Sequence, residues 1–228
     1  MPRISKLLTS GESLYHFSDD IVWGCRYYAR QSRKVDSNYS AFVFNASCVF
    51  LAGSFLDAKL NELTAQVISL GSKNTFIPLP FWRTVHESRK TLSFKDKWNL
   101  ISSASNGTTW NAEEEPFQSY DLIVSLRNEL VHYKPEYGKT TEPPIKKIKA
   151  LLKRFKGPGF ISVVSPADTY WVTELLSSRQ LSTWVSETVD IFDMKFEHLL
   201  SAKEFTDNDK FMYQLRAVSH DPWGANKI

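Results

Sequence analysis

The segment from Ser40 to Leu70 constrains the fold more than any other part of the sequence. Its apolar residues recur at spacings of four and three, which is the pattern of one face of an α-helix. The members of this stripe are Phe42, Ala46, Val49, Gly53, Leu56, Leu60, Leu63 and Val67. Gly71 and Ser72 follow the stripe and are typical of a helix end. We therefore expect one long helix whose apolar face is covered by other helices.

Shorter helical patterns occupy most of the remaining chain. We expect helices at 18–31, from Ser93 onward, at 118–133, at 143–156 and within 165–199. Ser93-Phe94-Lys95-Asp96 resembles a capping box with Asp in place of Glu. Two stretches, 74–81 with its two prolines and 102–116 with Asn106-Gly107, are predicted to be loops. The fold class is thus predicted as all-α, a bundle of about six helices around one core.

Composition restricts the class of protein. The 228 residues are enough for one substantial core, so we expect a single domain over 1–228. Its core would span about 40–200, with the helix at 18–31 packed on it and a C-terminal tail at 204–228. The 42% hydrophobic and 23% charged contents are those of an ordinary globular chain. The net charge of +3 permits a nucleic-acid partner without requiring one.

The sequence offers no pattern typical of a metal or membrane protein. Cys25 and Cys48 do not form a CxxC pair, and no His, Cys or carboxylate cluster has ligand spacing, so we expect buried thiols, no metal and no cofactor. Met1 to Lys6 is not followed by the apolar core of a signal peptide. The apolar window from Ala41 to Gly53 is too short, and too polar at Asn45, to span a bilayer. We therefore expect a cytoplasmic protein without a membrane partner.

The stretch Arg127-Asn128-Glu129-Leu130-Val131-His132 lies near the end of the helix expected at 118–133. Asn128 and His132 are four residues apart and share a helix face, with Arg127 beside them. A permanently charged guanidinium and a side chain that exchanges protons near neutral pH suit phosphodiester cleavage. The same residues also fit an ordinary helix end, with Arg127 in a local ion pair and His132 as a cap. Spacing alone favours this second interpretation.

The stretch from Leu126 to Pro135 resembles the signature of the HEPN superfamily, the higher-eukaryote and prokaryote nucleotide-binding domains. That signature is an arginine, commonly followed by a polar residue, and a histidine a few residues later. The preceding long helix carries Asp57-Ala58-Lys59-Leu60-Asn61-Glu62, as an acidic residue and an asparagine often do in such proteins. Lys95-Asp96-Lys97-Trp98 and 184–189 are similar to the flanking helices of related uncharacterised bacterial proteins. The resemblance covers roughly 40–200.

The resemblance implies a helical bundle with a two-fold dimer interface, which places two copies of the motif across a cleft. Active members of the superfamily are metal-independent endoribonucleases. Arg127 would then stabilise the phosphate in the transition state, and His132 would act as general acid or base. Asn128 would orient His132 or the substrate. The 2′-hydroxyl of RNA would be the nucleophile and would leave a 2′,3′-cyclic phosphate.

Further residues are expected to support this site. By the resemblance, Asp57 would hold Arg127 in place, with Asn61 and Tyr133 as further supporting residues. The helix at 143–156 has a basic face that can follow an RNA backbone or simply be solvated. The candidate RNA-binding residues on it are Lys146, Lys149, Lys153 and Arg154.

Three functions therefore remain open. The first is an endoribonuclease that acts on RNA as a homodimer, as a toxin or an anti-phage defence factor, with an antitoxin or another protein as partner. The second is a catalytically inactive HEPN-like module that binds RNA or a protein. The third is a purely structural helical protein in which Arg127 and His132 only end a helix.

Overall fold

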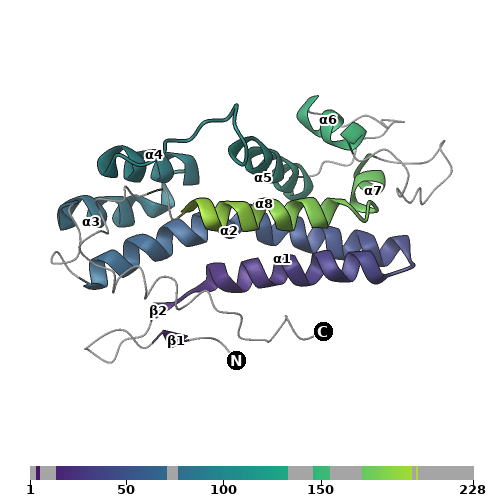
Figure 1. The fold of residues 1–228 in the computed structure, drawn as a ribbon, viewed down its shortest axis with the longest axis horizontal. Coiled ribbons are helices and arrows are strands. Elements are labelled where there is room, and N and C mark those ends of the chain that lie inside the picture. The colour runs from purple at the N-terminus through teal and green to yellow at the C-terminus, as the bar shows by residue number, and fades with distance from the viewer. Residues whose placement is uncertain are drawn as a thin grey trace. The chain divides into compact units, whose positions relative to one another are not determined.

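The computed structural model describes residues 4–5, 14–70, 77–132, 146–154, 171–196 and 199. The described helices are α1 (Phe17–Lys34), α2 (Asn38–Leu70), α3 (Leu79–Glu87), α4 (Phe94–Ser105), α5 (Phe117–Val131), α6 (Lys146–Arg154), α7 (Trp171–Leu176) and α8 (Leu181–Phe196) (Figure 1). A 3-10 helix, η2 (Ser88–Lys90), follows α3. Two short strands, β1 (Ile4–Ser5) and β2 (Leu14–Tyr15), pair antiparallel. The all-α class is confirmed in this part of the chain, with eight α-helices where about six were expected.

The chain separates into two compact units. Unit 1 comprises Met1–Asp19, Asp57–Trp110 and Lys195–Ile228. Unit 2 comprises Asp20–Leu56 and Asn111–Met194. Helix α2 contributes its first part to unit 2 and its second part to unit 1. The expected single domain over 1–228 stays a prediction.

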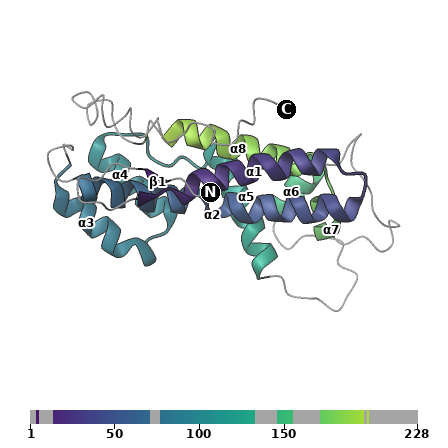
Figure 2. The same cartoon turned by 90° about the horizontal axis from the view of Figure 1, so that it is seen from below.

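Helix α2 is the long helix that the apolar stripe predicted. It runs from Asn38 to Leu70. Most of the stripe is buried, including Val49, Leu56, Leu60, Leu63 and Val67. Within unit 2, α1 lies alongside the first part of α2 in both views (Figures 1 and 2). The two helices approach closely at Gly24, where an added Cβ would lie 2.5 Å from Cδ1 of Leu51.

By length and composition alone, α2 is also apolar enough over Tyr39–Ser69 to cross a membrane. The core helix of a soluble protein passes the same test. In its second part, Asp57 pairs with Lys97 of α4, and Glu62 accepts a hydrogen bond from the amide N–H of Ser18 in α1. These are contacts of a helix packed within a protein. The expected cytoplasmic location stays a prediction.

Asn45 of α2 joins three helices of unit 2 through one buried amide. Its Nδ2 donates to the carbonyl oxygens of Leu176 and Ser178, each at 2.7 Å. Its Oδ1 accepts a hydrogen bond of 2.9 Å from Oγ of Ser32 in α1. Because Leu176 is the last residue of α7, the amide links α1, α2 and the end of α7. A single residue thus satisfies three buried polar groups.

Tyr120 joins α5 to α2. Its hydroxyl accepts a hydrogen bond from the amide N–H of Leu56 and donates one to the carbonyl of Ala52, both at 2.9 Å. An uninterrupted α-helix pairs these two backbone groups directly. The hydroxyl therefore lies within the hydrogen-bond ladder of α2. The ring also packs against Phe192 of α8, with the centroids 4.9 Å apart.

The two cysteines are free and buried, as predicted. Each sulfur faces the backbone of the other residue, with Cys25 Sγ 3.8 Å from the Cys48 carbonyl and Cys48 Sγ 3.6 Å from the Cys25 carbonyl. The hydrogen bond with Cys25 and burial raise the pKa of the Cys48 thiol. Both residues therefore serve as small core side chains that keep α1 close to α2.

Two segments that were predicted to be loops are partly helical. The loop expected at 74–81 ends early, because α3 begins at Leu79. Pro78 is the N-cap and Pro80 lies in the first turn, where a helix needs no N–H donor and tolerates proline. The loop expected at 102–116 begins later than predicted, because α4 continues to Ser105. The predicted capping box at the start of α4 is confirmed by the reciprocal bonds of Ser93 and Asp96.

Replacing Asn45 with alanine should lower the free energy of unfolding by roughly 2–4 kcal/mol, because two buried carbonyls and a buried hydroxyl lose their partner. Urea denaturation followed by circular dichroism measures this change. Ser47→Ala is the matched control, since the Ser47 hydroxyl donates only to the Val43 carbonyl of its own helix. We expect the control to change stability by less than about 0.5 kcal/mol. Equal losses in both variants would contradict the joining role of Asn45.

Candidate functional site

The motif residues lie at the C-terminal end of α5. Ile123 and Leu126 are fully buried and hold the helix in unit 2. His132 is the C-cap, and its amide N–H donates to the Asn128 carbonyl at 2.9 Å. The side chains of Asn128 and His132 are exposed, and that of Arg127 is half-buried. The helix therefore presents the three polar residues at its margin, as the sequence predicted.

Arg127 is positioned by Gly53 and Asn128. A Cβ added at Gly53 of α2 would lie 2.9 Å from Cγ and 3.1 Å from Cβ of Arg127. The missing side chain at Gly53 thus provides the space in which the apolar stem of Arg127 lies. Nη1 of Arg127 donates to Oδ1 of Asn128 at 3.0 Å. The stem is packed on α2, and the charged end is held at the surface.

The expected supporting residues have other partners. Asp57 and Asn61 lie in unit 1, where they surround Lys97 of α4. The predicted role of Asp57 in holding Arg127 stays a prediction, and the contacts that the structure shows for Arg127 are those with Gly53 and Asn128. Tyr133 lies outside the described residues.

Lys97 is a buried lysine that the sequence analysis gave no role. Its side chain is 1% exposed, and its Nζ donates to Oδ1 of Asp57 at 2.5 Å and to Oδ1 of Asn61 at 2.9 Å. Nδ2 of Asn61 lies 3.4 Å from Oδ2 of Asp57. The two α2 residues are four apart, so both reach the same ammonium group. The spacing of Asp57 and Asn61 indicates a shared polar face, but nothing local to either segment identifies Lys97 as its partner.

His86 of α3 lies at the edge of this polar cluster in unit 1. Its Nδ1 is 3.3 Å from Oγ1 of Thr64, which donates to the Asn61 carbonyl at 2.9 Å. Partial burial lowers the pKa of His86, and the positive charge of Arg89 lowers it further. Both causes favour the neutral imidazole, so His86 serves here as a hydrogen-bonding group.

Helix α6 carries the predicted basic face. Ile148 is fully buried, so this side of α6 packs against other parts of unit 2. Lys146 is exposed and Lys149 is half-buried. The side chains of Lys153 and Arg154 lie outside the described part of the structure. Their proposed contact with RNA stays a prediction.

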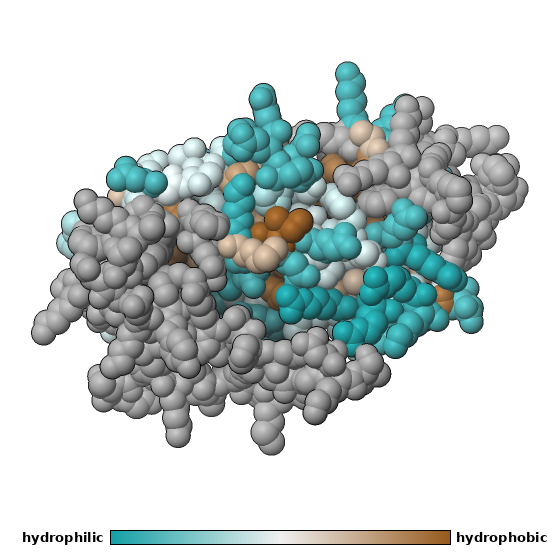
Figure 3. Space-filling view, viewed as in Figure 1, coloured by the Kyte–Doolittle hydropathy of each residue, from teal (hydrophilic) through white to brown (hydrophobic). Residues whose placement is uncertain are grey.

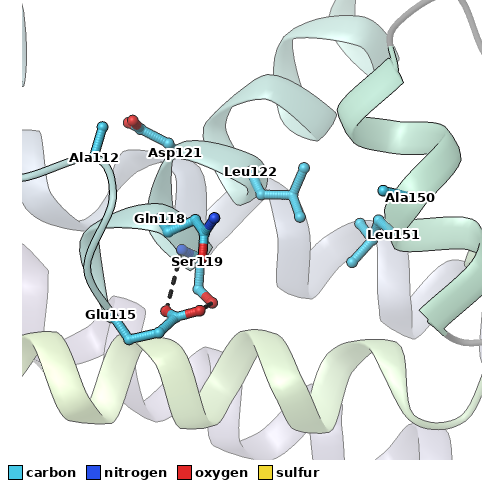
Figure 4. Close-up of a pocket in the computed structure, with 8 residues that line it drawn as sticks. All are labelled: Ala112, Glu115, Gln118, Ser119, Asp121, Leu122, Ala150 and Leu151. Atoms are coloured by element: carbon cyan, nitrogen blue, oxygen red, sulfur yellow. Dashed lines mark hydrogen bonds between the residues drawn. The ribbon is translucent and has the colours of Figure 1, made fainter.

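A cavity of about 310 Å³ lies at the other end of the motif helix, between α5 and α6 (Figure 4). Its lining residues are Ala112, Glu115, Gln118, Ser119, Asp121, Leu122, Ala150 and Leu151. Glu115 accepts hydrogen bonds from the Ser119 amide at 3.3 Å and the Ser119 hydroxyl at 2.8 Å. The two carboxylates of the cavity disfavour a phosphate group. Asp121 is also eleven residues before His132, about 16 Å along the helix, so the cavity is separate from the motif.

Among the side chains that the structure describes, no group of three or more His, Cys, Asp or Glu residues is arranged to hold a metal ion. The three consecutive glutamates at 113–115 are exposed.

We expect the two partners of the Lys97–Asp57 ion pair to differ in how much stability is lost when each is replaced. Asp57→Ala leaves a buried ammonium without its counter-charge and should destabilise the protein by roughly 2–4 kcal/mol. Lys97→Met should cost less than about 1 kcal/mol, because the side chain of Asp57 is 49% exposed and stays solvated. Thermal and urea denaturation of both variants give the comparison. A larger loss in Lys97→Met than in Asp57→Ala would show that the ammonium is not the group that needs its partner.

Comparison with known proteins leaves the family assignment open. No family model, curated protein or solved structure matches this chain. The resemblance to the HEPN superfamily therefore rests on the residues around Arg127 and His132 and on the long helix that precedes them.

Proposed function

We propose that this protein is a metal-independent endoribonuclease of HEPN type. Its site would comprise Arg127, Asn128 and His132 from two chains of a two-fold homodimer, with RNA as substrate. The observation that carries the proposal is the placement of Arg127, whose stem is packed against Gly53 while its guanidinium is tethered to Asn128. A charged group held in this way, on a helix that ends at an exposed histidine, is suited to phosphate chemistry.

The proposed reaction uses the positive charge of Arg127 and proton transfer by His132. The 2′-hydroxyl of RNA attacks the adjacent phosphorus and loses its proton to a neutral His132. The O2′–P bond forms, and the P–O5′ bond breaks with protonation of the 5′-oxygen by a protonated His132. A dimer supplies two copies of His132, one for each proton transfer. Arg127 stabilises the negative charge on the phosphoryl oxygens in the transition state.

The packing of the Arg127 stem supports a catalytic use over a role as an ordinary surface charge. A long arginine side chain at a helix margin normally loses considerable rotamer freedom when it binds a ligand. Here the stem lies against α2 at Gly53, and one hydrogen bond joins the guanidinium to Asn128. Part of the entropic cost of binding a phosphate is therefore met by the fold.

The biological role proposed for this activity is that of a toxin or an anti-phage defence factor, with an antitoxin or another protein as its regulator. The alternative is an inactive module that binds RNA or a protein. The two proposals differ in one measurable respect, because only the ribonuclease yields RNA fragments that end in a 2′,3′-cyclic phosphate.

Arg127→Ala and His132→Ala should each lower the rate of RNA cleavage by roughly a hundredfold or more, because each removes a group that acts in the transition state. His132→Ala should keep the native melting temperature to within a few degrees, since His132 is exposed. Arg127→Ala should lower it modestly, because the stem of Arg127 that packs against Gly53 is lost. Gel assays with labelled RNA, run beside thermal melts, measure both quantities. Unchanged cleavage in both folded variants would end the ribonuclease proposal, and RNA binding without any cleavage in the native chain would favour the inactive module.

Gly53→Ala tests the positioning of Arg127 without touching a catalytic group. The added methyl group would lie 2.9 Å from Cγ of Arg127 and must displace that side chain. We expect at least about a tenfold loss of cleavage while α2 itself gains helix propensity. Ser54→Ala is the matched control, because the Ser54 hydroxyl donates only to the Phe50 carbonyl within α2. A loss shared by both variants would point to α2 in general and not to Arg127.

RNA cleavage should survive EDTA, because the proposed reaction uses only the guanidinium of Arg127 and the imidazole of His132. The assay compares initial rates in EDTA with those in magnesium or manganese. Activity that disappeared in EDTA and returned with either metal would contradict this mechanism, even in a protein that cleaves RNA.

A further inference from the structure

We propose that the exposed face of α1 binds single-stranded RNA. Trp23 and Tyr27 would stack against unpaired bases, and Arg30, Arg33 and Lys34 would contact phosphates. The inference rests on the proposed function, because it takes RNA as the partner. It adds a substrate-binding surface on a helix that carries none of the motif residues.

The sequence of α1 separates two faces. Ile21, Val22, Cys25 and Ala29 are buried on one side. The spacing of four, three and four residues places Trp23, Tyr27, Arg30 and Lys34 on the other side. Trp23, Tyr27, Arg33 and Lys34 are exposed, and Arg30 is half-buried. From Trp23 to Lys34 the face extends about 16 Å along the helix axis.

The aromatic part of this face is an ordered platform. The Trp23 side chain is 38% exposed and that of Tyr27 is 40% exposed. Their rings are stacked, with centroids 5.4 Å apart and planes 16° apart. Tyr27 packs edge-on against Tyr28, and Tyr28 stacks on Phe44 of α2. Exposed rings that are held in this way lose little freedom when a base stacks on them.

The cationic part continues along the same helix. Arg33 and Lys34 form its last turn, and Arg26 and Arg30 precede them at helical spacing. Arg26 is partly neutralised, since its Nε and Nη2 both lie 2.9 Å from Oδ1 of Asp190. Strongly hydrophilic side chains gather over the part of the surface where Figure 1 places α1 (Figure 3). Cations next to exposed rings match the alternation of phosphates and bases in an unpaired strand.

Two other partners fit the face less well. A membrane-surface helix needs a broad apolar stripe to insert into lipid, but the apolar side of α1 is already buried within unit 2. A second copy of this chain, docked through the same face, would bring two sets of cations together. Unpaired RNA satisfies both the rings and the charges.

The test measures binding by full-length protein that carries Arg127→Ala and His132→Ala, so that the RNA probe stays intact. The probe is a fluorescein-labelled single-stranded oligouridylate of about twelve nucleotides, followed by fluorescence anisotropy. Adding Trp23→Ala with Tyr27→Ala should weaken binding by roughly tenfold or more. Arg30→Gln with Arg33→Gln should also weaken binding. The slope of the logarithm of the binding constant against the logarithm of the salt concentration should become less steep by about 0.7 for each lost phosphate contact. Leu100→Ala, a residue of α4 that is 42% exposed, should leave the affinity unchanged.

Further arms keep the result decisive. Trp23→Phe with Tyr27→Phe should retain binding to within about threefold, because a phenyl ring still stacks. Loss of the two rings should weaken the binding of fully paired RNA much less than the binding of single-stranded RNA. Unchanged affinity in the folded ring and arginine variants would overturn the inference. A protein that bound anionic lipid vesicles through the same residues, and did not bind the oligouridylate, would overturn it as well. These outcomes are independent of cleavage by the native chain, so the inference and the proposed function can fail separately.

Discussion

The hydroxyl of Tyr120 determines how the motif helix lies on its neighbour. It is placed between the Leu56 amide and the Ala52 carbonyl, so that both buried backbone groups keep a partner while α5 is joined to α2. Only one register of α5 on α2 allows this arrangement, because a shifted hydroxyl would leave buried polar groups without partners. Arg127 lies two turns after Tyr120 and meets Gly53, one residue after Ala52. This contact therefore fixes the register in which Ile123 and Leu126 are buried and in which Arg127 meets Gly53.

The same principle operates elsewhere in both units. Asn45 sets the relation of α1, α2 and α7 in unit 2, and Lys97 sets that of α4 and α2 in unit 1. Apolar burial brings helices together, but it allows one helix to shift along another, because aliphatic contacts are similar in energy at different registers. A buried polar group with all of its partners allows one arrangement. Each unit thus combines a large apolar interior with a few polar contacts that select its geometry.

The candidate site and the exposed face of α1 differ in how their charges are held. Arg127 is confined by a packed stem and a side-chain hydrogen bond. The cations of α1 lie on a solvent-facing surface beside two ordered rings, Trp23 and Tyr27. The first arrangement suits recognition of one phosphate in a defined geometry, and the second suits a strand that is held along its length.

The sequence by itself determined the helical class, the extent of α2, the capping box of α4 and the exposed margin of α5. These features depend on residues a few positions apart, so their spacing can be read directly. It did not show that α3 begins between two prolines, that Asp57 pairs with Lys97 forty residues away, or that Gly53 makes space for Arg127. Such contacts are decided by which helix faces meet and in which register. Helical periodicity defines a face but not its partner, and only the tertiary structure supplies that partner.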